Sequence, residues 1–100
     1  MCEEYGCRMS KLDDTEIESR LADLEGWERA GDAICKEFER NDFVGSVDFV
    51  KAIVQPAEDM GHHPDLSISW DTVKVTITTH SEGGITAADF DLAERIDGLS

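Results

Sequence analysis

The chain has 100 residues, 40% of them hydrophobic, and its 23 acidic residues against nine basic ones give a formal net charge of −14. This length suits a single domain, and the apolar fraction is too high for a disordered chain. The negative charge excludes ready binding to a phosphate backbone, and no apolar run approaches the roughly 20 residues that a membrane span needs.

The excess of acidic residues predicts that the protein is adapted to a high salt concentration. Self-repulsion between like charges destabilises a compact state, and salt relieves it, since the Debye length falls to about 3 Å at 1 M. We therefore expect a cytoplasm of high salt concentration, with an ordinary acidic protein as the alternative. The chain starts without a basic region followed by an apolar run, so no signal peptide is expected. The odd number of cysteines favours reduced thiols in a cytoplasm.

The first part of the chain predicts a tail, a helix and a hairpin. Residues 1–11 show no periodicity and are expected to be a mobile tail ahead of a single domain over 12–100. Thr15 and Glu18 form a capping-box pattern for a first helix that Gly26 would end. Two short strands, 27–30 and 33–38, are expected around a Gly-Asp turn.

A second helix is predicted over residues 43–60, after a capping residue at Asn41 or Asp42. Pro56 removes a backbone hydrogen bond, so we expect a kink there or an early end to the helix. Gly61 and Pro64 would close the element.

Two alternating segments and a last helix complete the chain. Leu66, Ile68 and Trp70 alternate with serines, which predicts a strand with one buried face. A second strand from Val73 is expected to reach His80, where the alternation puts the imidazole on the polar face, at the rim of a pocket. Thr86 and Asp89 then have the spacing of a capping box that starts the last helix.

The order of elements predicts an α+β fold. Helix, two strands, helix, two strands and helix (α-β-β-α-β-β-α) favour an antiparallel four-stranded sheet with three helices on one face.

All three histidines of the chain, His62, His63 and His80, lie within one stretch, residues 58–89. Imidazoles titrate near neutral pH, so their convergence would suit proton transfer. Pro64 restricts His63 to an extended backbone, in which neighbouring side chains point apart. Glu58 lies four residues before His62 and would orient that imidazole if the helix continues. Asp89, in the first turn of the last helix, can equally be a capping residue or a site residue.

Two other interpretations of the histidines remain open. Zinc could use the three imidazoles with Glu58 or Asp89, but the spacing is not H-E-x-x-H and adjacent histidines rarely bind one ion, so no metal is expected. The three histidines could also be unrelated. Trp27 and Trp70 suit either the core or the wall of a pocket.

These residues together resemble the pterin-4a-carbinolamine dehydratase family. The likeness covers roughly residues 12–97. It rests on the following residues: Gly26-Trp27, Asp32-Ala33-Ile34, Phe38, Asp42-Phe43, Glu58, His62-His63-Pro64-Asp65, Trp70, Val73, Thr79-His80, Gly84-Ile85-Thr86 and Asp89.

The resemblance implies an activity and a set of roles. Members dehydrate 4a-hydroxytetrahydropterin to quinonoid dihydropterin without a metal or organic cofactor, and they form oligomers. His62 and His80 would be the general acid and base, and His63 would hold the pterin. Glu58 and Asp89 would support the histidines, while Trp27 and Pro64 would line the site. We expect a homodimer or homotetramer.

Two alternatives belong to the same resemblance. The chain could be a non-catalytic oligomerisation or binding module of the same fold. It could also dehydrate a different pterin, such as one related to molybdopterin.

Overall fold

The computed structural model describes residues 12–99, without the side chain of His80. The tail predicted for residues 1–11 lies outside this range. The elements are α1 (Asp14–Ala22), β1 (Glu28–Ala30), β2 (Ala33–Glu39), α2 (Phe43–Met60), β3 (Asp65–Ser69), β4 (Thr72–Ile77), the short 3-10 helix η1 (His80–Glu82) and α3 (Ala87–Asp97). This confirms the predicted order and fold class.

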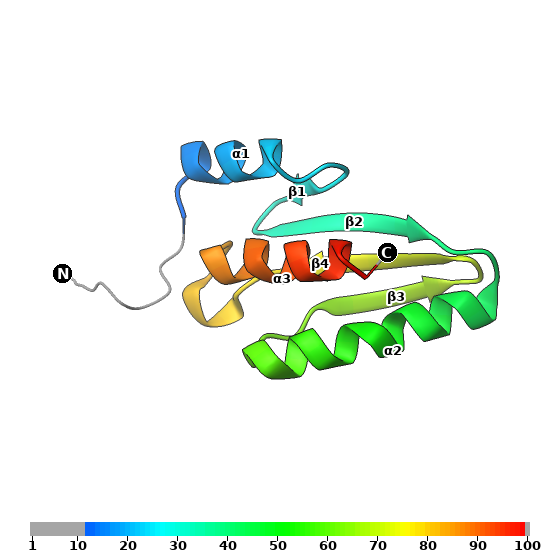
Figure 1. The fold of residues 1–100 in the computed structure, drawn as a ribbon. Coiled ribbons are helices and arrows are strands. Elements are labelled where there is room, and N and C mark those ends of the chain that lie inside the picture. The colour runs from blue at the N-terminus through cyan, green and yellow to red at the C-terminus, as the bar shows by residue number, and fades with distance from the viewer. Residues whose placement is uncertain (1–11, 100) are drawn as a thin grey trace.

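The four strands form one antiparallel sheet in the order β1-β2-β4-β3. Pairing of Ile34 with Ile77 and of Phe38 with Val73 gathers the apolar side chains of β2 and β4 on one face. They are buried there against the three helices, and α3 lies across the sheet between α1 and α2 (Figure 1). The opposite face carries polar residues such as Lys74 and Thr76.

The first helix starts at a different cap from the one expected. Asp13, not Thr15, accepts a hydrogen bond from the amide of Glu16 at 2.8 Å. Three acidic or hydroxyl residues in succession can all cap a helix, so the pattern alone did not identify which one does. The helix ends at Ala22, and Gly26 lies in the following turn with a positive φ of 88°.

The second helix runs over the predicted residues. Asp42 caps it, accepting from the amide of Gly45 at 2.7 Å. The helix continues through Pro56 to Met60, so the alternative of an early end is wrong. Gly61 ends it in the left-handed conformation, with φ 62°.

Two expectations for the second hairpin are wrong. Strand β3 is exposed along its whole length, because it is the edge strand next to α2, and Leu66 and Ile68 remain 36% and 37% exposed. Trp70 lies in the hairpin turn, 70% exposed, with φ 53°. Strand β4 ends at Ile77, so His80 starts η1 and does not continue the alternation of the strand.

None of the helices in residues 12–99 combines the length and the hydropathy of a transmembrane segment.

Candidate active site

The end of α2 sets the backbone position of His62. Because Gly61 takes the left-handed conformation that glycine adopts at low cost, the chain turns back over the last helical turn. The amide of His62 then donates to the carbonyl oxygen of Ala57 at 3.0 Å. The imidazole therefore starts from a backbone that is fixed to the helix.

The start of α3 provides the partner of that imidazole. Thr86 caps the helix and Asp89 completes the predicted capping box, with its Oδ2 accepting from the amide of Thr86 at 2.8 Å. The other carboxylate oxygen, Oδ1, lies 2.5 Å from Nε2 of His62. Asp89 is fully buried and the His62 side chain is 15% exposed, so this contact is shielded from water. Asp89 is thus both the cap and the partner of His62.

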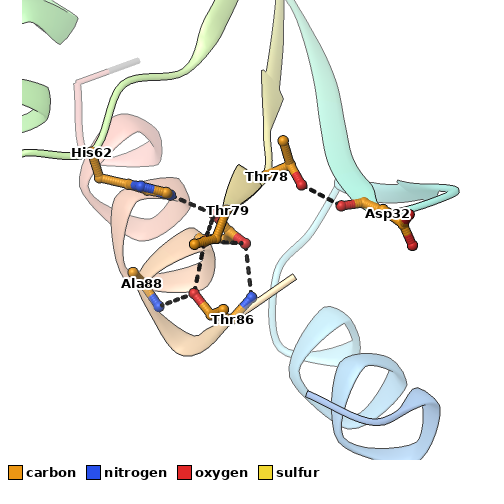
Figure 2. Close-up of polar contacts among 7 residues, drawn as sticks. Asp32, His62, Thr78, Thr79, Thr86 and Ala88 are labelled. Carbon is orange, nitrogen blue, oxygen red and sulfur yellow. Dashed lines mark hydrogen bonds and ion pairs between the residues drawn. The ribbon is translucent and has the colours of Figure 1, made fainter. Parts of the chain in front are cut away.

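Two threonine hydroxyls complete the surroundings of Asp89. Oγ1 of Thr79 donates to Oδ1 of Asp89 at 3.0 Å and lies 2.9 Å from Oγ1 of Thr86 (Figure 2). Thr79 was not among the residues predicted to form the site. The sequence contained one indication. Thr79 continues the alternation of Val73, Val75 and Ile77, whose side chains face the core, and a polar group that faces the core needs a hydrogen-bond partner.

His63 has a separate carboxylate partner. Its Nε2 lies 2.6 Å from Oε2 of Glu58, and both side chains are more than 60% exposed. We expected Glu58 to face His62, but the helix ends at Met60 and the left-handed Gly61 redirects the chain. The two neighbouring imidazoles therefore face different carboxylates, one buried beside α3 and one in solvent beside α2.

The backbone of His80 lies next to the residues that contact Asp89. It follows Thr79, whose hydroxyl contacts the same carboxylate as His62, so its Cα lies about 3.8 Å from that of Thr79. The residues after it form a closed loop, because the backbones of Thr79 and Gly84 exchange hydrogen bonds of 3.0 and 3.3 Å. The side chain of His80 lies outside the described part of the structure.

The structure does not bring Trp27 to His62. Its side chain is buried in the core, edge-on to Phe38, and its indole N–H donates to Asp97 at 3.1 Å. Asp97 ends α3, while Asp89 is in its first turn, about 12 Å away at 1.5 Å per residue. Pro64 is half-buried beside His63, and both line a mainly apolar groove of about 150 Å³ between α2 and β3.

The arrangement offers proton chemistry. A histidine whose one nitrogen is held by a buried carboxylate has a fixed ring orientation, and its other nitrogen can accept or deliver a proton. Among the side chains that the structure describes, no group of three histidine, cysteine or acidic residues is placed to hold a metal ion.

Comparisons with known proteins agree on one family. A family model described as "Pterin 4 alpha carbinolamine dehydratase" matches residues 10–99. A protein of Thermosynechococcus vestitus named "Putative pterin-4-alpha-carbinolamine dehydratase" is 51% identical over 90 residues, covering 90% of this chain and 95% of the relative. A protein of the same name from a Roseiflexus species is 48% identical over 90 residues, covering 90% and 97%.

Two solved structures share the fold. One, described as a transcriptional coactivator/pterin dehydratase from Brucella melitensis, has a TM-score of 0.86 and 30% identity, covering 90% of this chain and 98% of its own. The other is described as a pterin dehydratase-like protein identified as a RuBisCO assembly factor in the alpha-carboxysome. It has a TM-score of 0.63 and 23% identity, covering 76% and 90%, which is a likeness of fold.

Proposed function

Because the chain belongs to the pterin 4 alpha carbinolamine dehydratase family, we propose that it is a lyase that converts a 4a-hydroxytetrahydropterin to quinonoid dihydropterin and water. The membership confirms the resemblance found in the sequence. The single observation that carries the proposal is the contact between His62 and the fully buried Asp89, 2.5 Å apart, beside the chain segment that leads to His80.

The reaction needs one acid and one base. The bond between carbon 4a and the hydroxyl oxygen breaks, and the oxygen needs a proton to leave as water. The adjacent ring nitrogen gives up its proton, and a carbon–nitrogen double bond forms. Imidazoles are suited to both transfers near neutral pH, so His62 and His80 take these two roles. Asp89 orients His62 and does not itself touch the pterin.

His63 and Pro64 would hold the substrate. They line the apolar groove between α2 and β3, where a flat ring can rest against carbon atoms while the exposed imidazole of His63 donates or accepts a hydrogen bond. Glu58 would orient His63 from 2.6 Å. We assign no pocket role to Trp27, because its indole is buried in the core.

The protein would act in the cytoplasm as a homodimer or homotetramer, without a metal or organic cofactor. Exposed apolar residues on α2 support the oligomer: Phe43, Val44 and Val54 are each more than half exposed. Phe43 and Val54 lie on the same side of α2, because eleven residues are about three helical turns, and an apolar patch on one side of a helix is typical of a surface that another protein covers.

The test is turnover of a 4a-hydroxypterin generated in the cuvette by an aromatic amino-acid hydroxylase. We expect the protein to accelerate formation of the quinonoid product. Replacing His62 and His80 together with alanine should lower kcat by about 100-fold or more, the usual contribution of general acid–base groups. A Lys74→Ala protein, changed on the exposed polar face of the sheet, is the control for handling and folding.

Three outcomes separate the alternatives. Undiminished turnover by the double variant would reject the assigned roles. No turnover by the unaltered protein with any pterin would favour the non-catalytic oligomerisation or binding module. Turnover only of a molybdopterin-related substrate would favour a dehydratase of a different pterin.

A further inference from the structure

The hydroxyl of Thr79 connects three parts of the fold. Its Oγ1 lies 3.0 and 3.2 Å from the two oxygens of Asp89 and 2.9 Å from Oγ1 of Thr86. All three side chains are buried, so water does not compete for these contacts. Figure 2 shows Thr79 next to Thr86 at the start of α3, with His62 approaching from the end of α2.

The hydrogen bonds in this cluster allow one consistent assignment of donors and acceptors. Thr79 has a single hydroxyl proton, and a carboxylate only accepts, so the proton of Thr79 belongs on its bond to Asp89. Thr86 must then donate to Thr79. The oxygen of Thr86 is left to accept from the amide of Ala88 at 3.3 Å. Each bond in the chain from Ala88 to Asp89 thereby has one donor and one acceptor.

The same assignment of donors and acceptors determines which nitrogen of His62 carries the hydrogen. Asp89 already accepts the amide hydrogen of Thr86 and the hydroxyl hydrogen of Thr79, and it has no hydrogen of its own to give. The contact with His62 is satisfied when Nε2 carries the hydrogen and donates it to Oδ1. In a neutral imidazole the other nitrogen is then bare, so Nδ1 is the nitrogen that can exchange a proton with a substrate.

We propose that Thr79 is a positioning residue that, together with Thr86, fixes the orientation of the Asp89 carboxylate so that Oδ1 faces Nε2 of His62, and thereby keeps His62 in the tautomer with hydrogen on Nε2 and a free Nδ1. The tautomer follows from the hydrogen bonds alone. The consequence for turnover rests on the proposed dehydratase function.

Thr79 also holds the second histidine-bearing segment. Its backbone exchanges two hydrogen bonds with Gly84, and its carbonyl accepts from the amide of Glu82 at 3.0 Å, closing the loop that His80 begins. One residue therefore fixes the partner of His62 with its side chain and the backbone of His80 with its main chain. A substitution that removes only the hydroxyl separates the two effects.

The test is the nitrogen-15 spectrum of the imidazoles in the full-length protein without a ligand. Histidine-labelled protein is measured at a pH where all three rings are neutral, and signals are assigned with His63→Gln and His80→Gln proteins. We expect the Nδ1 of His62 to resonate as an unprotonated nitrogen and Nε2 as a protonated one. In Thr79→Val, which keeps the branched shape, the two resonances should move toward each other as the other tautomer becomes populated.

Two further variants are the controls. Thr79→Ser restores the hydroxyl and should restore the separation of the two resonances. Thr76→Val removes a hydroxyl from the opposite face of β4, outside the cluster, and should leave the separation as in the unaltered protein. Dispersed amide spectra show which variants fold; if Thr79→Val does not fold, Thr79→Ala, which also removes the hydroxyl, replaces it with the same expected result.

Turnover provides the second measurement. Thr79→Val should lower kcat for the 4a-hydroxypterin about 10-fold with little change in KM, as expected for loss of a group that orients a reactive one. Thr79→Ser should recover most of it. Hydrogen on Nδ1 of His62 in the unaltered protein, or an unchanged separation in Thr79→Val, would overturn the proposal. If the tautomer of the unaltered protein and its change in Thr79→Val are as expected but the protein turns over no pterin, the proposed function is rejected and the assignment of Thr79 stands.

Discussion

Replacing Asp89 with asparagine tests the structure at its most constrained point. The two side chains have nearly the same shape, but asparagine exchanges one acceptor oxygen for an N–H₂ donor. The carboxylate accepts from three groups: the amide of Thr86, the hydroxyl of Thr79 and Nε2 of His62. An amide group at this position must therefore direct its own hydrogens at one of these donors.

The size of the effect follows from those contacts. One buried donor left without a partner costs about 1–3 kcal/mol, and the two surviving bonds lose the strength that a charged acceptor gives, about 1 kcal/mol together. Removing a buried charge offsets part of this loss. We expect a net loss of about 2 kcal/mol in the free energy of unfolding, which lowers the Tm of a domain of this size by about 10 °C.

The assay is thermal unfolding followed by circular dichroism, with Asp91→Asn as the matched control. Asp91 lies two residues further along α3 and is exposed, so the control makes the same change in net charge outside the cluster. Its free energy of unfolding should change by no more than about 0.5 kcal/mol. If Asp89→Asn melts together with Asp91→Asn, the carboxylate is not held by three donors, and the reasoning about His62 fails with it.

Two further predictions concern stability. Trp70→Asn should raise the free energy of unfolding by about 1 kcal/mol, since a bulky residue at φ 53° is strained and asparagine tolerates that conformation; a lower Tm in thermal unfolding would show that the exposed indole packs on something. Raising KCl from dilute buffer to 1 M should raise the Tm by about 5 °C, as expected when screening relieves about 1 kcal/mol of repulsion among the excess acidic groups. The same Tm in both buffers would reject adaptation to high salt and support the alternative of an ordinary acidic protein.

The sequence predicted the elements whose signals are local. The second helix was predicted over 43–60 because a capping aspartate, an apolar stripe and a glycine stop act within a few residues of one another. The capping box of Thr86 and Asp89 was predicted for the same reason. This box also placed one member of the candidate site, because the carboxylate that caps α3 is the one that contacts His62.

The wrong predictions arose from features of the tertiary structure that the alternation and spacing of residues do not reveal. Alternation in β3 indicated which side chains share a face, but not that the strand is at the edge of the sheet, where α2 leaves Leu66 and Ile68 partly exposed. The alternation of β4 was extended past Ile77, although the backbone leaves the sheet there to form η1. Glu58 was assigned to His62 by helical spacing, and the spacing ceased to apply once Gly61 turned the chain.

The left-handed end of α2 has a consequence for how the two helices depend on each other. The amide of His62 is bound to Ala57, so this imidazole moves with α2, while Asp89 belongs to the first turn of α3. The His62–Asp89 contact therefore connects the end of α2 with the start of α3, so that a displacement of one helix relative to the other would change the distance between Nε2 and Oδ1.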